Sequence, residues 1–166
     1  MPNINDPNDP NASTLTPGSG AGSMSTGAPG ATSRGQQGAR IEGTPEETPG
    51  PGPRIMSSST LEGNDVMNRQ GEKLGSIEEI MLDVSSGRVA YAVLAAGGFL
   101  GIGDKLFAIP WQALTLDTDN ECFILDIDKT RLENAPGFDK DHWPAMADTR
   151  WASELNTYYG TQPYWP

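Results

Sequence analysis

The chain has 166 residues, of which 22 are acidic and 11 are basic, so its formal net charge is −11. Because affinity for nucleic acid comes mainly from Lys and Arg side chains that neutralise phosphates, this charge excludes a typical nucleic-acid binder, and it argues equally against docking on anionic lipid. No stretch approaches the roughly 20 apolar residues that span a bilayer, and the start of the chain lacks the pattern of a secretion signal. We therefore expect a cytoplasmic protein without stable membrane insertion, and the single Cys122 fits a reducing compartment.

Residues 1–59 are predicted to form a disordered tail. This segment is rich in Pro, Gly, Ser, Thr and Asn, it holds most of the fourteen prolines, and no aromatic residue occurs before Tyr91. Its few apolar side chains can bury too little surface to offset the entropy of ordering the segment. Core-forming residues therefore begin near residue 60, and we expect one small domain over residues 60–138.

The first part of this domain is predicted to contain a short strand at 65–67 and then a hairpin. Residues 88–95 alternate bulky and small apolar side chains, which is typical of a strand buried on both faces, and Gly87 precedes them in a turn. Residues 74–84 fit both a strand and helical spacing. We favour a strand because a turn and a strand follow, and we interpret the change of frame at Glu78 and Glu79 as a β-bulge.

Residues 97–111, GGFLGIGDKLFAIPW, raise the question of a phosphate-binding loop. Gly98 and Gly103 have the separation of a P-loop, but Asp104 stands where that loop needs a lysine, and a strand follows instead of a helix. We therefore interpret the glycines as a tight connection between strands of a small β-barrel, in which Phe99 and Leu100 either lie under the barrel or face a partner.

Three further strands are predicted at 105–109, 114–117 and 121–127, with Pro110 ending the first of them. About six short strands within some 65 residues predict a mainly β fold, a small antiparallel six-stranded barrel, because closure removes exposed strand edges.

No residue pattern predicts catalysis, a cofactor or a metal site. Carboxylates at 117, 119, 121 and 128 follow the spacing of a calcium-binding loop, but Cys122 replaces the required glycine and the segment is predicted to be a strand. His142 is the only histidine and has no second nitrogen or sulfur ligand near it in sequence. Cys122 is interpreted as a small core residue, since no basic neighbour in sequence lowers its pKa.

The extension over residues 139–166 carries three of the four tryptophans and is predicted to contain a helix near 148–159. Trp151, Leu155, Tyr158 and Tyr159 recur at helical spacing, and Asp148 or Thr149 can cap the first turn. Such a stripe packs on its own domain more often than on a partner, yet Trp and Tyr are also enriched in binding hot spots. We expect the helix to cover the barrel or a second copy.

Four separated motifs give the chain a resemblance to a known family. They are Gly71-Glu72-Lys73-Leu74-Gly75-Ser76-Ile77, then Asp83 with Ser86-Gly87-Arg88-Val89, then residues 97–111, and finally Arg131-Leu132-Glu133-Asn134-Ala135-Pro136-Gly137-Phe138. In this order they resemble a stand-alone PRC-barrel protein. The family shares its small six-stranded barrel with the cytoplasmic domain of the photosynthetic reaction-centre H subunit and with the C-terminal domain of a ribosome-maturation factor.

The resemblance implies a non-enzymatic module for docking or assembly. Its expected partners are a second copy of itself, in a homodimer, and an unidentified protein. The resemblance also loosely associates the chain with a stress response. One alternative is a barrel that binds a small ligand or a cation. Another, by analogy with the H subunit, is an accessory protein of a photosynthetic electron-transfer complex. The side chains that we expect at an interface are Phe99, Leu100, Ile102, Trp111, Trp151, Leu155, Tyr158 and Tyr159.

Overall fold

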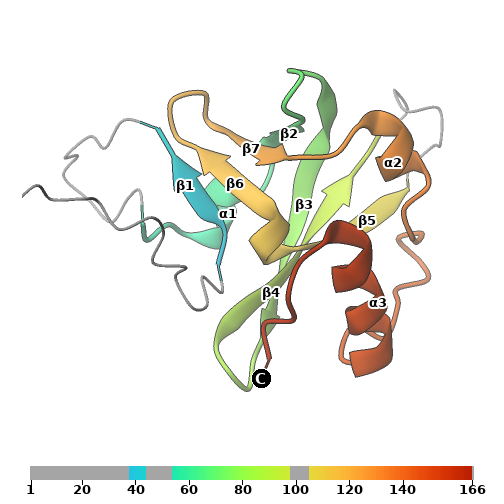
Figure 1. Cartoon of the computed structure of the whole chain (residues 1–166). Coiled ribbons are helices and arrows are strands. Elements are labelled where there is room, and N and C mark those ends of the chain that lie inside the picture. The colour runs from blue at the N-terminus through green and yellow to red at the C-terminus, as the bar shows by residue number, and fades with distance from the viewer. Residues whose placement is uncertain (1–37, 44–53, 98–104, 166) are drawn as a thin grey trace, which may run out of the picture. The chain divides into compact units, whose positions relative to one another are not determined.

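The computed structural model describes residues 38–43, 54–97 and 105–165, and Figure 1 shows the elements they form. The described strands are β1 (Arg40–Glu42), β2 (Asp65–Met67), β3 (Lys73–Asp83), β4 (Arg88–Ala95), β5 (Leu106–Pro110), β6 (Leu114–Asp117) and β7 (Cys122–Leu125). The described helices are α1 (Ser58–Leu61), α2 (Lys129–Glu133), α3 (Thr149–Tyr159) and the 3₁₀ turn η2 (Trp111–Ala113).

The predicted mainly β class with a C-terminal helix is confirmed. The strands form one sheet in the order β1-β6-β7-β2-β3-β4-β5, and within the described residues this ladder is not closed between β5 and β1. The bounds of β2, β4 and β6 are those predicted. β5 begins one residue later than expected and includes Pro110, which pairs with Tyr91, and β7 is shorter than the predicted 121–127.

The ambiguous segment before the hairpin is a strand, and its bulge lies where the sequence placed it. In the β3–β4 ladder Ile77 pairs with Leu94 and Glu79 pairs with Val93, so Glu78 is the extra residue. The bulge moves Ile77, which is fully buried, and Ile80 onto the core side despite their odd spacing. The apolar residues of this segment thus show helical spacing because the bulge at Glu78 shifts the alternation of the strand by one residue.

The directions of two strand pairs differ from the predicted antiparallel barrel, and the sheet has seven strands instead of six. β1 pairs in parallel with β6, and β2 pairs in parallel with β7, while the remaining neighbours are antiparallel. Hydrophobic alternation indicates which face of a strand is buried, but it carries no information on the identity or direction of the neighbouring strand.

The seventh strand, β1, lies inside the segment that composition predicts to be disordered, and so do Ser58 and Ser59 of α1, so the prediction is wrong for these residues. All three residues of β1 are exposed, which explains why apolar content gave no sign of them. Their order comes from pairing with β6, which lies far away in sequence. Most of the predicted tail, residues 1–37 and 44–53, lies outside the described residues, and the division of the chain at residue 59 stays a prediction.

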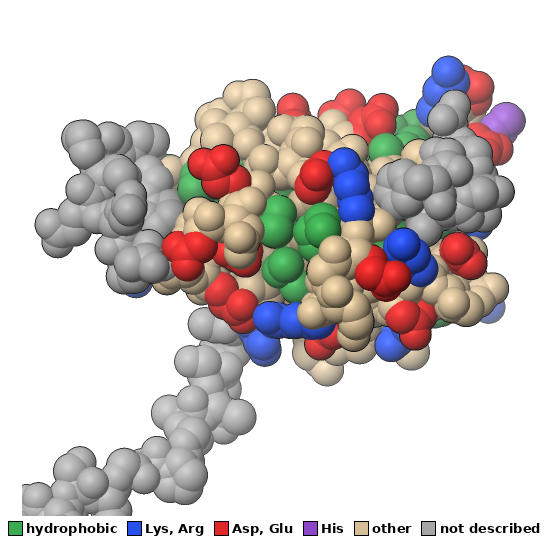
Figure 2. Space-filling model, turned by 90° about the horizontal axis from the view of Figure 1, so that it is seen from above, with side chains coloured by type: hydrophobic (Ala, Val, Ile, Leu, Met, Phe, Trp, Pro, Cys, Tyr) green, Lys and Arg blue, Asp and Glu red, His purple; other side chains and the backbone are tan. Residues whose placement is uncertain are grey.

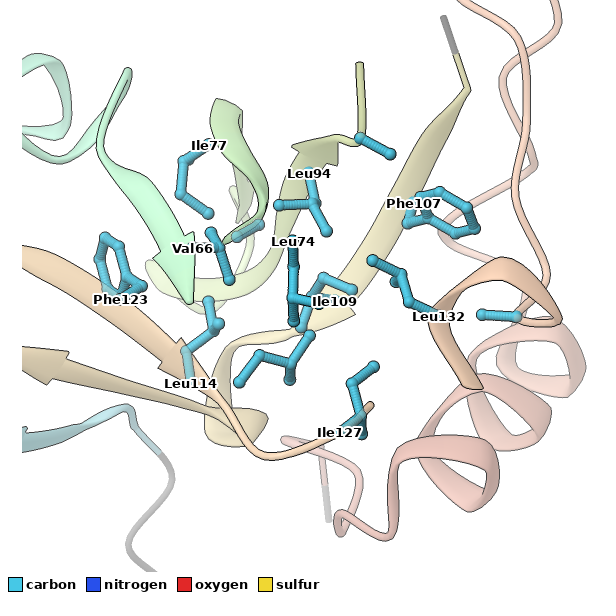
Figure 3. Packing of buried hydrophobic residues seen from close by; sticks show 14 of the residues in the cluster. Val66, Leu74, Ile77, Leu94, Phe107, Ile109, Leu114, Phe123, Ile127 and Leu132 are labelled. Atoms are coloured by element: carbon cyan, nitrogen blue, oxygen red, sulfur yellow. The ribbon is translucent and has the colours of Figure 1, made fainter. Parts of the chain in front are cut away.

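Figure 3 shows the core, in which side chains from strands β2 to β7 converge and α2 contributes from one end. Among the labelled residues, Leu132 of α2 is fully buried and Ile127 lies in the connection before it. Asp128 caps α2 by accepting a hydrogen bond from the backbone N–H of Arg131. The motif that begins at Arg131 therefore closes one end of the core.

The end of the same motif covers the far edge of the sheet. Leu106 of β5 and Phe138 exchange two backbone hydrogen bonds, each of 2.9 Å. A Cβ on Gly137 would lie 2.9 Å from the carbonyl oxygen of Leu106 and 3.0 Å from the Phe107 ring, so only glycine fits this close approach.

Helix α3 confirms the prediction over 148–159. Asp148 is its N-cap and accepts hydrogen bonds from the N–H groups of Arg150 and Trp151, while Gly160 ends it in the left-handed conformation. The helix packs against β5 (Figure 1) and buries Leu155 with Ala152 in a second cluster that includes Tyr91.

Candidate interaction surfaces

Three of the predicted interface residues, Phe99, Leu100 and Ile102, lie outside the described residues. Their orientation toward the core or toward a partner stays a prediction, as does the role of the whole glycine-rich connection between β4 and β5.

The C-terminal aromatic side chains lie on their own domain. The Trp151 ring meets that of Tyr91 edge to face with centroids 5.4 Å apart, and Tyr164 contacts Tyr91 from another side at 6.1 Å. Leu155 is only 1% exposed, whereas Trp151, Tyr158 and Tyr159 are half-buried. Their role in binding stays a prediction.

One of these aromatic residues fastens α3 to α2. Tyr158 donates its hydroxyl to the carbonyl oxygen of Arg131, and the Arg131 guanidinium donates to the carbonyl oxygen of Tyr158. The same guanidinium lies 5.4 Å from the centre of the Tyr158 ring. Arg131 is thus already the structural partner of Tyr158, through two hydrogen bonds and a cation–π contact.

Neighbouring Tyr159 differs, because its buried hydroxyl has no hydrogen-bond partner among the residues that the structure describes, and the same holds for Tyr91. Burial raises the pKa of both phenols well above the ordinary value of 10.0, so both stay neutral.

Trp111, the remaining predicted residue, lies in an apolar groove beside the edge strand β1. The ring of Trp111 packs on that of Phe123 with centroids 5.7 Å apart. We call this hollow the β1 groove; its volume is about 420 Å³, and its main apolar lining is Ala39, Ile41, Ile55, Met56, Leu61, Val89, Trp111, Leu116 and Phe123.

The β1 groove is incompletely covered within one copy. Ile55 is 71% exposed and Ile41 of β1 is 46% exposed, although both line an apolar hollow. Contiguous exposed apolar surface of this kind marks interaction sites more often than single exposed side chains do. Apart from Trp111, reasoning from sequence missed the groove, because Ile41 and Ile55 both fall inside the predicted tail.

β1 is anchored at its end by polar contacts. The carbonyl oxygen of Glu42 accepts hydrogen bonds from the backbone N–H of Thr118 at 3.0 Å and from its hydroxyl at 3.1 Å. Both carboxylate oxygens of Glu42 lie 3.2 Å from the Arg69 guanidinium, and this contact raises the pKa of Arg69. The pairing is bidentate and exposed.

A second, polar hollow of about 770 Å³ lies next to this anchor and includes Asp65, Asp117 and Glu121. The carboxylate of Asp117 accepts hydrogen bonds from the side chain and backbone of Asn120, which lower its pKa. Within residues 38–43, 54–97 and 105–165 no group of three or more His, Cys, Asp or Glu side chains is arranged to hold a metal ion.

The two side chains considered for chemistry lie in different surroundings. Cys122 is buried on β7 as predicted, beside the polar hollow, and burial raises the pKa of its thiol. His142 is exposed, with the carboxylate of Asp139 at 3.8 Å.

Figure 2 shows one face of the molecule on which hydrophobic side chains gather at the centre and acidic and basic side chains surround them. An apolar centre with a polar rim is typical of protein interfaces. In the part of the chain that the structure describes, no helix is long and apolar enough to cross a membrane.

Comparison with known proteins identifies a domain within the chain, which includes neither β1 nor α3. Residues 53–132 match the model of the PRC-barrel domain. Among solved structures, a putative 16S ribosomal RNA processing protein, RimM, from Pseudomonas aeruginosa is similar at 17% identity with a TM-score of 0.35, and the match covers 45% of each chain. This chain thus corresponds to less than half of that protein, and we transfer no activity from it. Comparison with curated proteins gives no match.

Proposed function

Because residues 53–132 form a PRC-barrel domain, we propose that this protein is a non-enzymatic protein-interaction or assembly module that self-associates. The observation that carries the proposal is the β1 groove, where Ile55 and Ile41 remain exposed beside half-buried Trp111. Covering such side chains removes apolar surface from water, which drives most protein association.

The composition of the groove supports a protein partner in preference to a small ligand. Its lining is mainly aliphatic, with one Trp, one Phe and a single charged residue, Arg54. A tryptophan in an exposed apolar hollow is the type of residue that dominates protein interfaces. The separate polar hollow has a carboxylate-rich lining, which disfavours phosphate-bearing ligands.

Sedimentation equilibrium of the full chain tests the proposal. We expect a monomer–dimer equilibrium, and we expect Ile55→Asp to weaken it at least about tenfold, because a carboxylate would be buried without a partner. Val84→Asp is the matched control, since Val84 is 91% exposed and does not line the groove. Equal weakening by both variants would assign the effect to added charge, and a strictly monomeric wild type would refute self-association.

A further inference from the structure

We propose that β1 strands are exchanged between two copies, so that residues 38–43 of one copy pair with β6 of the other. The inference rests on the proposed self-association and names the element that carries it. Within a single copy, β1 is the outermost strand of the sheet and β6 is its only neighbour in the described ladder.

The contacts that hold β1 do not depend on which copy supplies the strand. The polar contacts are backbone pairing with residues 115–117, the hydrogen bonds from Thr118 to the Glu42 carbonyl, and the ion pair between Glu42 and Arg69. The partners in these polar contacts lie at least 27 positions away in sequence from the strand. In addition, Ala39 packs on the core cluster and Ile41 lines the β1 groove. An identical segment from a second copy can therefore make the same set of contacts, which is the general condition for exchange of an element.

The length of the connecting chain permits the exchange. Ten residues, 44–53, separate Gly43 from Arg54, and ten residues can span up to about 33–36 Å when extended. This reach is several times the spacing of about 4.8 Å between neighbouring strands. β1 can thus extend to the edge of an adjacent domain without displacing α1 or β2 from their own domain.

The β1 groove supplies a reason for the exchanged form to be favoured. Exchange remakes the strand contacts without net gain, so it needs additional buried surface to offset the entropy of association. Crossing strands bring a second domain next to the groove, where Ile55 and Ile41 are exposed in the single copy. Burying these two side chains against the second domain would stabilise the exchanged form, whereas in a single copy they stay exposed to water.

The position of Gly43 restricts what can occupy the edge. Gly43 has φ of +127°, and a Cβ there would lie 2.1 Å from the Thr118 hydroxyl oxygen. A strand that pairs with β6 in this way must therefore have glycine after the residue that binds Arg69. The segment Arg40-Ile41-Glu42-Gly43 of a second copy meets this condition by identity, whereas an arbitrary extended peptide does not.

Charge reversal at the anchor tests the exchange in the full chain. Arg69→Glu places two carboxylates together, and Glu42→Arg places two guanidinium groups together, so each variant alone is repelled both within a copy and between identical copies. In an equimolar mixture, exchange creates two anchors. At one, the unchanged Glu42 of the first variant meets the unchanged Arg69 of the second. At the other, the two substituted side chains meet, and they also have opposite charges. Native mass spectrometry at low salt should show heterodimers in at least about tenfold excess over either homodimer, since both anchors are restored.

Two controls isolate the effect. The double variant Glu42→Arg, Arg69→Glu in one chain should dimerise like the wild type. Arg150 and Glu154 form another exposed ion pair, 3.7 Å apart within α3, so mixing Arg150→Glu with Glu154→Arg should give a statistical distribution of dimers.

The outcomes separate this inference from the proposed function. A wild type that dimerises while the anchor variants mix statistically would overturn the exchange and leave self-association through another surface. A monomeric wild type would overturn both, even beside a heterodimeric anchor mixture, because the natural chain would then exchange no strand. Absence of dimers in every sample would overturn both.

Discussion

Replacement of Gly75 by alanine should destabilise the domain strongly, because β3 passes very close to the end of β4 at this residue. An added Cβ would lie 2.3 Å from the carbonyl oxygen of Ala95 and 3.0 Å from a methyl carbon of Leu94. Contacts under 3.0 Å essentially never occur for real Cβ atoms, so the two strands would have to separate by about 0.7 Å.

The magnitude follows from two opposing effects. Overpacking of a buried site costs roughly 1–3 kcal/mol, while Gly→Ala recovers about 0.4–1 kcal/mol by restricting the unfolded chain. Gly75 is buried and the clash is with backbone, which cannot rotate away, so we expect the upper part of the range. A net loss of about 2 kcal/mol lowers Tm by roughly 8–16 °C in a domain of this size.

Urea denaturation followed by circular dichroism measures the difference, with Gly38→Ala as the matched control. A Cβ on Gly38 has no neighbour within 4 Å, so this variant carries the same unfolded-state gain without the clash. Equal free energies of unfolding for the two variants would refute the claim that the approach of β3 to β4 excludes a side chain.

Two further predictions concern individual polar groups. Tyr158→Phe should lower the free energy of unfolding by about 0.5–1.5 kcal/mol, because it removes the hydroxyl that donates a hydrogen bond to the Arg131 carbonyl. Tyr159→Phe should be neutral or stabilising, because the Tyr159 hydroxyl is buried without a partner in the described structure. Equal losses of stability for the two variants in thermal denaturation would contradict this prediction. The pKa of Asp117 is below its ordinary value of 3.8, so its stabilising effect is present above that pH and is lost as pH falls through the lower folded value. Asp117→Ala should therefore lower the free energy of unfolding near neutral pH, and in acid the stabilities of the variant and the wild type should become equal. If the denaturant midpoints of the two proteins differed by the same amount from neutral pH down to strong acid, this assignment would be contradicted.

The sequence allowed the mainly β class, the hairpin and the bulge to be predicted because each depends on local information. The frame change at Glu78 could be assigned to a bulge because a turn with Gly87 and an alternating strand followed it. The cap at Asp148 likewise follows from residues next to it in the chain.

The edge strand and its groove could not be predicted, because they depend on contacts between distant residues. Arg40–Glu42 has one apolar residue in three, and nothing in its neighbourhood indicates that Thr118 and Arg69 will bind it. Trp111 was recognised as an interface candidate, but its neighbours Ile55 and Leu61 gave no signal, because the groove forms only when separate segments meet.

The parallel pairing of β2 with β7 sets an order on how the domain can fold during synthesis. Met67 leaves the ribosome 55 residues before Cys122, which at about 5–20 residues per second is a delay of roughly 3–11 s. During that time β3, β4 and β5 can pair with one another, because their contacts are close in sequence, while one edge of β2 has no strand to bind. The nascent chain therefore exposes an open sheet edge for seconds, an interval in which this edge can pair with a wrong strand.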